Sequence, residues 1–425
     1  MQLTNGSRVV VVGGGPAGSF SAMQLLQLSK VARLDLEVVI FEARDFNQPG
    51  PGGCNKCAGI LSSSCLANME TLGLRLPVDV IQAELDTYIL NLGGLQLPIH
   101  PMDPSRRILS VYRGSGPRWG SDPLPQSFDG WLLDQARERG AFVRRSRVQT
   151  IKPGPRPIVI TPRESLEADL VVVSTGINNS SPLDSAWGYR PPQIEVMAQD
   201  EVPLLSTTSG SQVHVFLDHP AGLIFGGVIP KGRYANISLL GKKLPQDSFS
   251  QFMNHRGLIP LLPETPSVLC SCTPRVSVTS GSGYYDDRMV VVGDAAVTRL
   301  YKDGIGAAFT TARAAIQTAI FRGISQSDFA KGYDPVCRRI AMDNFYGHLL
   351  FRSWALFRRS PLFINAWGQA ILSEALLPTQ QRVLERVLWG VFTGEETYRQ
   401  ILSLMLSWPA IRSFLGGILK TWSKR

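Results

Sequence analysis

Short apolar runs separated by glycine-rich turns open the chain. Residues 9–12 are four consecutive valines, and an uninterrupted β-branched run is typical of a strand buried on both faces of a parallel sheet. A glycine-rich turn ends the run, residues 19–28 have a composition that favours a helix, and residues 38–41 form a second apolar run. The pattern predicts a strand, a turn, a helix and a second parallel strand.

The same type of signal returns further along the chain. Residues 170–173 and 289–292 are apolar runs that predict two more strands of the same sheet. Between residues 127 and 147, apolar positions recur at helical spacing, and Ser127 or Asp129 could cap the start of this helix. These elements return the chain to the first sheet.

Residues 182–282 have a different pattern of apolar and polar positions. Apolar and polar positions alternate there in short runs, separated by breaks that contain Pro, Gly or Lys, as expected of antiparallel strands. The runs are residues 213–217, 223–229 and 234–240, and residues 87–92 form a similar piece. The sequence therefore predicts a separate antiparallel sheet inserted into the parallel one.

The turn after the first strand has glycines at the spacing of a dinucleotide-binding loop. Gly13, Gly15 and Gly18 fill the pattern G-x-G-x-x-G, with Pro16 and Ala17 between the last two. The first glycine allows a tight turn, the second lets the backbone approach a pyrophosphate, and the third lets helix and strand pack closely. The positive end of the following helix can then receive the phosphate charge.

An acidic residue ends the second strand at the position that this loop requires. Glu42, followed by Ala43, stands where a carboxylate accepts hydrogen bonds from an adenosine ribose. A glycine-rich turn without a ligand would explain neither the strand context nor the terminal glutamate. We therefore expect a dinucleotide site here.

Two further turns follow strands of the same predicted sheet. Thr175 and Gly176 come soon after residues 170–173. Gly293 and Asp294 come at the carboxyl end of the last apolar run, where ligands bind in open α/β sheets. Asp294 is therefore expected to bond a ribityl or ribose hydroxyl.

A small-residue segment then opens another helix. Gly304, Ile305 and Gly306 precede a helix that we expect from Ala307 onward. Small side chains would let the backbone come close to a flat ring. The positive end of the helix would stabilise an anionic reduced flavin at that position.

Cys54 and Cys57 stand at C-x-x-C spacing in residues 47–61, NQPGPGGCNKCAGIL. Three interpretations are open. A zinc site needs four ligands, and the second pair would be Cys270 and Cys272 at an unusual C-x-C spacing. A redox disulfide is chemically reasonable beside a flavin. In the third interpretation one cysteine faces the substrate and the other is incidental. The predicted site contains no metal.

Positive charge is concentrated near the C-terminus. The formal net charge is +9, and residues 338–425 contain twelve Lys or Arg against five Asp or Glu, together with five of the eight tryptophans. Basic residues interleaved with Trp, Phe and Leu suit an anionic membrane surface, and a solvated helical domain is the alternative. No nucleic-acid-binding motif accompanies the charge, so nucleic acid is not an expected partner.

The apolar stretches do not read as membrane spans. Residues 9–29 are uncharged, but glycines interrupt them and no cleavage-site pattern follows. Residues 345–357, 361–377 and 401–419 are broken by Pro, Gly or Arg, so none offers the roughly 20 apolar residues of a span. We expect them to lie on a bilayer or to cover the substrate cavity. Six unevenly spaced cysteines agree with a reducing compartment, so we expect a cytoplasmic protein, with the inner face of a membrane as a further possibility.

The order of these motifs resembles that of flavoprotein oxidoreductases with the para-hydroxybenzoate hydroxylase fold, and among them the geranylgeranyl reductases. The matching residues are Gly13 to Gly18, Glu42, the PGGCNKCAGIL loop, Phe128-Asp129, Asp169, Thr175-Gly176, Gly293 to Ala296 and Asp303 to Gly306. The resemblance spans residues 7–335. Two segments depart from it: Thr175-Gly176 stands in place of an Asp-Gly pair, and residues 297–304 read VTRLYKDG without the usual Gly- and Pro-containing form.

The resemblance implies FAD bound along the first domain, with its ring under the antiparallel sheet. Cys57-Ala58-Gly59 matches the Cys-x-Gly element that faces the substrate in that family, so Gly59 joins the cofactor-binding residues and Cys57 becomes the candidate proton donor or gate. The implied activity is reduction of carbon–carbon double bonds in a prenyl or other lipophilic substrate, with NAD(P)H or reduced ferredoxin as electron donor.

Three alternatives to this activity stay open. A flavin-dependent monooxygenase would share the fold and the motifs. A disulfide oxidoreductase would use Cys54 and Cys57, although no second strand-linked G-x-G-x-x-G marks a nicotinamide domain. A membrane-associated flavoprotein could pass electrons to a partner.

The predicted organisation is an α/β protein with three parts. Residues 1–75, 125–180 and 285–335 form a discontinuous, Rossmann-like FAD-binding domain. Residues 76–124 and 181–284 form a substrate domain built on the antiparallel sheet, and residues 336–425 form a helical C-terminal region.

Overall fold

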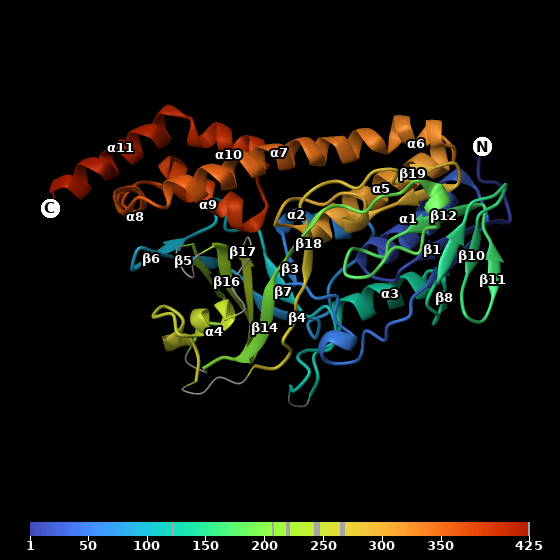
Figure 1. The fold of residues 1–425 in the computed structure, drawn as a ribbon, viewed down its shortest axis with the longest axis horizontal. Coiled ribbons are helices and arrows are strands. Elements are labelled where there is room, and N and C mark those ends of the chain that lie inside the picture. Colours follow the sequence, from blue (N-terminus) through green and yellow to red (C-terminus); the bar gives the residue numbers. More distant parts are fainter. Residues whose placement is uncertain (121–122, 206–207, 218–221, 242–246, 264–267, 424–425) are drawn as a thin grey trace.

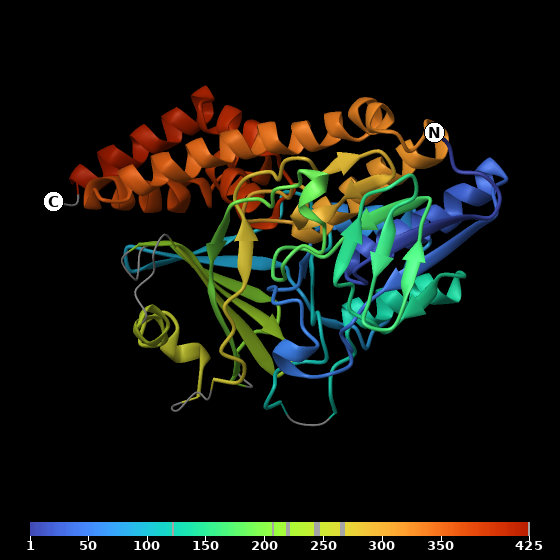
Figure 2. The same cartoon turned by 45° about the vertical axis from the view of Figure 1, so that its right-hand side comes forward.

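Two six-stranded sheets lie side by side under a shared layer of helices (Figures 1 and 2). The computed structural model describes residues 1–120, 123–205, 208–217, 222–241, 247–263 and 268–423. In both views the helical layer runs along the upper edge, from the N-terminal end of the molecule to the C-terminus. This layer bridges the two sheets.

The first sheet is the parallel one that the sequence predicts. Its order is β8-β2-β1-β12-β20-β19, and only the β19–β20 pair is antiparallel. The strands are β1 (Ser7–Val12), β2 (Leu36–Phe41), β8 (Phe142–Arg144), β12 (Leu170–Val173), β19 (Tyr285–Asp286) and β20 (Met289–Val291).

The four valines of β1 are all buried because both faces of this sheet are covered. Val9 and Val11 pack into the core shared with α1 (Pro16–Ala32), α3 (Phe128–Glu138) and α5 (Gly304–Phe321). Val10 and Val12 pack into a second core on the opposite face. That face is covered by the antiparallel strands β9 (Thr150–Lys152), β10 (Ile158–Ile160) and β11 (Ser165–Glu167).

The second sheet is antiparallel except for the β15–β5 pair. Its order is β14-β17-β16-β15-β5-β6. The strands are β5 (Thr87–Leu92), β6 (Leu95–Ile99), β14 (Ala198–Pro203), β15 (Gln212–Phe216), β16 (Leu223–Lys231) and β17 (Tyr234–Gly241). One face packs on α4 (Ser248–Met253), and the other faces the helical layer.

Smaller elements connect the two halves. They are β3 (Ile60–Leu61), β4 (Ile81–Glu84) and β7 (Leu109–Val111) in one sheet, β13 (Ile194–Val196) with β18 (Arg275–Ser277) in another, and helix α2 (Ser63–Glu70). Single 3-10 turns cover Gly50–Gly52, Ser185–Trp187, Ile259–Leu261, Gly293–Ala295 and Thr379–Gln381.

The C-terminal helices from α7 onward form one core with the second sheet, whereas α6 (Gln326–Gly332) packs into the core of the first. These later helices are α7 (Asp334–Phe357), α8 (Pro361–Glu374), α9 (Val383–Thr393), α10 (Tyr398–Met405) and α11 (Trp408–Ser423). Tyr88 and Leu90 of β5 share a buried cluster with Trp367 of α8, Trp389 of α9 and Ile401 of α10. Tyr88 and Trp389 are in edge-to-face contact, 5.4 Å between ring centroids. The region is therefore an integral part of the fold.

The α/β fold class that the sequence predicts is confirmed, with small differences at element ends. The strand predicted at residues 87–92 is β5, and the three predicted runs of the antiparallel sheet are β15, β16 and β17. Ser127 is the N-cap of α3, because its side chain accepts a hydrogen bond from the Gly130 N–H, whereas Asp129 is taken up by an ion pair. Helix α5 begins at Gly304, three residues before the predicted start.

Candidate cofactor and substrate cavity

One continuous cavity of about 750 Å³ connects the parallel sheet with the C-terminal helices. It starts at the glycine-rich turn after β1, passes the C-x-x-C loop, and ends between α7, α8 and α11. Most of the predicted cofactor residues line it, namely Gly13, Gly15, Pro16, Ala17, Glu42, Ala43, Gly59, Thr175, Gly176, Asp294, Gly304 and Ile305. Gly18, Gly293 and Gly306 lie outside the lining.

The three motif glycines have the separate tasks that their spacing suggests. Gly13 has φ +106°, and a Cβ there would come within 2.7 Å of the Ser174 carbonyl oxygen. Gly15 lines the cavity, and its Cβ would meet the Asn55 amide at 3.2 Å. A Cβ on Gly18 would lie only 1.8 Å from the Gly13 carbonyl oxygen. Gly18 therefore allows α1 to pack closely on β1, whereas Gly15 has no side chain that would project into the cavity.

The N-terminus of α1 points its free amides at this part of the cavity. Gly15 is its N-cap, Pro16 is in the first turn, and no side chain caps the helix. The first turn also holds no acidic residue. An uncapped helix N-terminus of this kind suits a diphosphate, because the amides and the helix dipole both favour negative charge.

Glu42 is held at the end of β2 by two backbone amides. Its Oε2 accepts a hydrogen bond from the Gly14 N–H at 2.7 Å, and its Oε1 accepts one from the Arg44 N–H at 2.8 Å. Each carboxylate oxygen keeps further acceptor capacity. The carboxylate on the cavity wall is thus positioned to accept from ribose hydroxyls.

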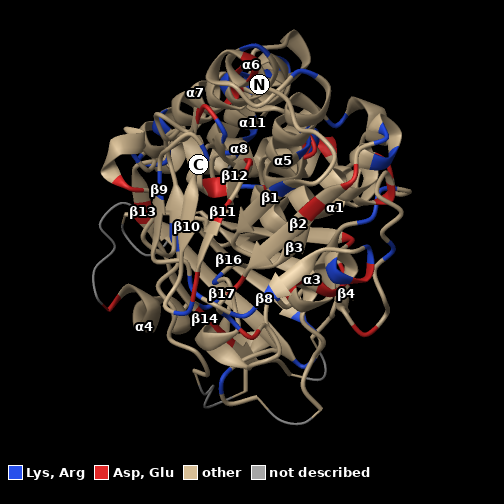
Figure 3. Ribbon diagram, turned by 90° about the vertical axis from the view of Figure 1, so that its right-hand side faces the viewer, with Lys and Arg blue, Asp and Glu red and all other residues tan. Residues whose placement is uncertain are grey.

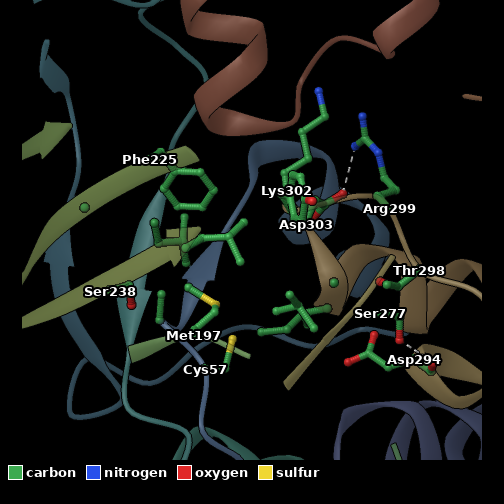
Figure 4. Close-up of a pocket in the computed structure, with 18 of the residues that line it drawn as sticks. Cys57, Met197, Phe225, Ser238, Ser277, Asp294, Thr298, Arg299, Lys302 and Asp303 are labelled. Atoms are coloured by element: carbon green, nitrogen blue, oxygen red, sulfur yellow. Dashed lines mark hydrogen bonds and ion pairs between the residues drawn. The ribbon is translucent and has the colours of Figure 1, made fainter. Parts of the chain in front are cut away.

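The middle of the cavity brings together the turns after β12 and β20. Asp294 lies on the wall beside Thr298 and Ser277, opposite Cys57 and Met197 (Figure 4). Burial raises the pKa of the Asp294 carboxyl. Thr175 also lies on the wall, and its buried hydroxyl has no hydrogen-bond partner within the described part of the chain.

Gly293 and Gly306 shape this region from behind the wall. Gly293 has φ +68°, and a Cβ there would approach the Ala17 side chain to 2.9 Å, so the glycine lets the turn pack against α1. A Cβ on Gly306 would meet the Asp303 carboxylate at 2.5 Å. Asp303 itself adopts a left-handed φ of 49° before α5 and accepts a hydrogen bond from the Ser62 hydroxyl. Both glycines are therefore structural residues of the cofactor end.

The C-x-x-C loop places its two thiols in different surroundings. Cys57 lines the cavity, and its Sγ accepts a hydrogen bond from the Gly59 N–H at 3.4 Å. Cys54 lies outside that lining, in a separate small pocket with Cys270 and Cys272. Burial raises the pKa of the Cys54 thiol to about 11. Lys56, between the two cysteines, has φ 53°, a left-handed conformation that reverses the local chain direction.

The disulfide and zinc interpretations of this loop find no support in its geometry. All six cysteines are free, so the pair Cys54 and Cys57 is not joined. Within the described residues, no group of three or more His, Cys, Asp or Glu side chains is arranged to hold a metal ion. The loop thus presents one thiol to the cavity.

A buried ion pair that the sequence did not reveal anchors this loop to α3. The Arg113 guanidinium donates to both carboxylate oxygens of Asp129, at 2.5 and 3.0 Å. Asn55 also donates to Asp129 and accepts from Arg44. Arg113, Asn55 and Arg44 all line the cavity near Gly15. The Phe128-Asp129 motif and the PGGCNKCAGIL loop that holds Asn55 hinted at two members of this network, whereas Arg44 and Arg113 lie in segments without periodicity.

A second buried pair lies behind the Cys57-Ala58-Gly59 segment. The Lys231 Nζ is 3.5 Å from the Glu201 Oε1, and it stands 4.6 Å from the centroid of the Tyr112 ring. Both charged side chains are buried. A Cβ on Gly59 would lie 3.3 Å from the Lys231 Nζ, so the glycine brings the backbone close to this charge. The Pro230-Lys231 dipeptide at the end of β16 is its only sequence signal.

The distal half of the cavity is an apolar chamber, by which we mean the part lined by β5, β15, β16, β17 and helices α7–α11. Figure 4 shows Phe225, Met197 and Ser238 on the sheet side of the boundary with the cofactor half. Its apolar lining includes Tyr88, Leu90, Val213, Val215, Leu217, Phe225, Ile229, Leu240, Trp354, Phe363, Trp367, Leu384, Leu388, Phe392, Met405, Ile411, Phe414 and Leu415. Among the described residues, these strands and helices contribute no charged side chain to the lining, and the charged residues that border the chamber, Arg299, Lys302 and Asp303, come from the segment before α5.

The VTRLYKDG segment fixes the C-terminal helices to the first domain. Arg299 donates to the carbonyl oxygens of Gly394 and Glu396, at 2.5 and 2.9 Å, and pairs with Asp303 at 3.1 Å. The Lys302 Nζ donates to the carbonyl oxygens of Gly390 and Glu396, both at 3.0 Å. Burial lowers the pKa of Lys302. The unusual sequence here therefore forms the seam between α9–α10 and the start of α5.

These observations fit FAD in the proximal half of the cavity. Gly15, which has no side chain to fill the cavity, and the uncapped N-terminus of α1 would hold the diphosphate. Glu42 would bind the adenosine ribose, and Asp294 would bind a hydroxyl of the ribityl chain. Gly304 and Ile305 at the start of α5 would lie along the ring. The three sequence motifs thus meet around one site.

No protein-family model and no curated protein matches the chain. Solved structures do match. A geranylgeranyl bacteriochlorophyll reductase-like protein from Thermoplasma acidophilum has a TM-score of 0.64 and 16% identity, covering 98% of this chain and 100% of that chain. A flavin-dependent brominase triple mutant has a TM-score of 0.59 and 14% identity, and the match covers 98% of this chain and 99% of that chain. A mutant of 2-methyl-3-hydroxypyridine-5-carboxylic acid oxygenase has a TM-score of 0.58 and 17% identity, and the match covers 84% of this chain and 92% of that chain.

At these identities the likeness shows the fold, and the chemistries of the three proteins differ. The near-complete coverage by the first two includes the helical region after residue 335, which the sequence resemblance did not reach. The chain therefore has the fold of the flavin-dependent oxidoreductases, with a proximal half-cavity whose residues fit FAD.

Proposed function

We propose that this protein is an FAD-dependent oxidoreductase that reduces carbon–carbon double bonds of a prenyl or similarly lipophilic substrate. The observation that carries the proposal is the apolar chamber beyond Cys57, whose strands and helices contribute no charged lining residue among those described. The charged residues that border it, Arg299, Lys302 and Asp303, are engaged with one another or with backbone carbonyls near α9 and α10. A hydroxylated aromatic acid would need a cation or several hydrogen-bond donors in that chamber, because an unpaired buried carboxylate is costly. A long hydrocarbon needs none.

The residues of this chain would bind, orient and exclude water. When bound and reduced by the electron donor, FAD supplies the hydride for the reduction, since cofactors carry the redox chemistry. The apolar side chains of β15, β16 and α9 would hold the alkene at the boundary of the two half-cavities and keep water away from it. The Cys57 Sγ–H, on the wall of the cavity, would give the proton to the second alkene carbon. The electron donor, NAD(P)H or reduced ferredoxin, is part of the proposal.

An anaerobic single-turnover experiment tests the activity. The flavin is reduced with dithionite, a geranylgeranyl lipid in detergent is added, and flavin absorbance and lipid mass are followed. We expect reoxidation of the flavin together with the gain of hydrogen at the double bonds. Reoxidation that requires oxygen and yields a hydroxylated product would establish the monooxygenase alternative instead.

Two serine variants test the role of Cys57. Cys57→Ser should slow lipid reduction by about 100-fold, the usual contribution of a general acid, while dithionite still reduces the flavin at the wild-type rate. Cys54→Ser is the matched control, because this thiol lies outside the cavity lining. Equal loss in both variants would favour a thiol pair over a single proton donor.

A further inference from the structure

We propose that the outer face of α7, α10 and α11 docks on an anionic lipid bilayer, and that the apolar chamber opens to the bilayer beside α11. The substrate would then pass from the membrane into the chamber without crossing water. The entry route rests on the proposed function, whereas the docking surface stands on its own contacts and charges.

The outward side of α7 carries a stripe of apolar residues. Met342, Phe345, Leu349 and Leu356 are exposed, and their spacing of three, four and seven residues puts them on one helix face. In Figures 1 and 2 this helix lies in the outermost layer, on the side away from the second sheet. Exposed apolar residues in one contiguous row mark a surface that has a partner.

Exposed apolar residues also lie at the end of α10 and on α11, which belong to the same helical layer as α7 (Figures 1 and 2). The exposed apolar residues there are Leu406, Trp408, Ile411, Leu415, Leu419 and Trp422. The opposite side of α11 packs on α8, where a Cβ on Gly417 would touch the Ala366 carbonyl oxygen. Together with the α7 stripe, these residues form what we call the outer apolar face.

The exposed charges of the C-terminal helices are all basic, although Arg338 and Arg386 pair with Asp334 and Glu396. The exposed charged residues from Arg338 to Ser423 are Arg338, Arg339, Arg352, Arg359, Arg386, Arg399, Arg412 and Lys420. Every acidic residue of the same stretch is buried or half-buried. At the opposite end of the molecule, Lys and Arg mix with Asp and Glu (Figure 3). Basic residues bordering apolar ones match an anionic bilayer, which supplies both lipid tails and negative headgroups.

The chamber reaches the surface at this face. Phe357 of α7 and Ile411 and Leu415 of α11 line the cavity, yet they are 48%, 40% and 49% exposed. Beneath them Phe363 of α8 stacks on Phe357 and contacts Phe414 of α11, with ring centroids 5.0 and 5.1 Å apart. Side chains that belong to both cavity and surface form a mouth. This mouth opens beside the outer apolar face.

A helix that crosses a bilayer needs about 20 apolar residues. Among the described residues, no single helix is long and apolar enough to cross it, and only α10 with α11 reaches the required length and composition, as a pair bent by 57°.

Vesicle flotation tests the docking surface. The probes are phosphatidylcholine vesicles with and without phosphatidylglycerol, at low and high salt. We expect wild-type protein to bind the anionic vesicles and to lose at least about 10-fold of that binding in high salt, because headgroup attraction is screened. Leu349→Glu combined with Leu419→Glu should reduce binding by at least about 10-fold.

Matched variants control for the chemistry of the substitutions. Val31→Glu, on α1, introduces the same side chain at a position as exposed (69%) as Leu419 (66%) but far from the face, and should leave binding unchanged. Arg352→Glu should weaken binding to anionic vesicles about 10-fold, whereas Arg163→Glu makes the same charge change in the β10–β11 turn and should not. Equal effects of face and control variants would overturn the docking proposal.

Deleting α7–α11 would not isolate the effect of the outer apolar face. Those helices share a buried core with β5 and β15, so their loss would expose the second sheet. Point substitutions on exposed residues avoid this. The wild-type protein could instead fail to bind anionic vesicles at low salt and form a dimer that Leu349→Glu dissociates. That result would overturn the docking proposal and assign the outer apolar face to a second copy of the chain.

Two tryptophan substitutions one helical turn apart test the mouth. Leu415 lines the cavity and Leu419 does not, although both are exposed. Leu415→Trp should slow uptake of a pyrene-labelled isoprenoid alcohol from vesicles by at least about 10-fold while vesicle binding is kept. Leu419→Trp should change neither.

The readouts separate this inference from the proposed function. Flotation and probe uptake do not depend on catalysis, so an enzyme that turns out to hydroxylate its lipid would still show both. Equal uptake by wild type and Leu415→Trp would overturn the mouth, even if the reduction of double bonds is confirmed.

Discussion

The two halves of the cavity are built by different means. The proximal half is shaped largely by backbone: glycines, an uncapped helix N-terminus and a few fixed carboxylates from short sequence motifs. The distal half is shaped by side chains that come from residue 88 to residue 415. Backbone recognition tolerates almost no added atom, whereas a side-chain chamber can be reshaped one residue at a time. One fold can therefore keep its cofactor site and vary its substrate.

The largest expected effect is at Gly15, where the proximal half should fail from a single added side chain. Gly15→Val should lose bound FAD, because the side chain would project into the cavity at the uncapped helix, at a cost of about 3 kcal/mol or more, which is over 100-fold in affinity. The visible flavin absorbance of purified protein measures it. Gly210→Val, whose Cβ would meet nothing within 4 Å, is the control. Full flavin occupancy in Gly15→Val would contradict the site.

The two thiols of the C-x-x-C loop should differ in reactivity. A pKa of about 11 at Cys54, against an ordinary 9.0, lowers its thiolate fraction at neutral pH about 100-fold, and the thiolate is the reactive form. Alkylation by iodoacetamide, located by peptide mass spectrometry, should modify Cys54 about 100-fold more slowly than a free model thiol. Since the raised pKa keeps the proton on, the rate should climb as pH rises toward 11. Rapid labelling at neutral pH would place Cys54 in a more polar setting.

The seam between α9–α10 and the start of α5 should contribute to the free energy of unfolding. Arg299→Ala removes hydrogen bonds to two carbonyl oxygens and to Asp303, and should lower the free energy of unfolding by about 2 kcal/mol. Urea unfolding measures the loss. Arg107→Ala breaks an exposed pair with Glu84 and should cost under about 1 kcal/mol. Equal losses would mean that Arg299 does not hold the helices.

The smallest effect is expected in the distal half. Phe225→Gln places an amide in the apolar chamber and should raise KM for a lipophilic substrate about 10-fold, which corresponds to about 1.4 kcal/mol, with flavin content unchanged. Phe225→Leu keeps the wall apolar and should stay close to wild type. If the glutamine variant bound substrate as well as the leucine variant, the chamber would not be the substrate site.

The sequence by itself determined the cofactor end of the molecule. The valine run of β1, the spacing of Gly13, Gly15 and Gly18, and the position of Glu42 each encode local backbone geometry, and local geometry is set by neighbouring residues. The antiparallel strands were readable for the same reason, because alternation along one strand reports which face is buried.

Only the tertiary structure decided what the rest of the chain does. Lys56, in a left-handed conformation, turns Cys54 and Cys57 into different surroundings, although their spacing suggested a pair. The VTRLYKDG segment, a departure from the expected motif, proved to hold α9 and α10 through Arg299 and Lys302. The chamber joins elements far apart in the chain. Such contacts depend on long-range packing, and no periodicity or spacing within one segment records them.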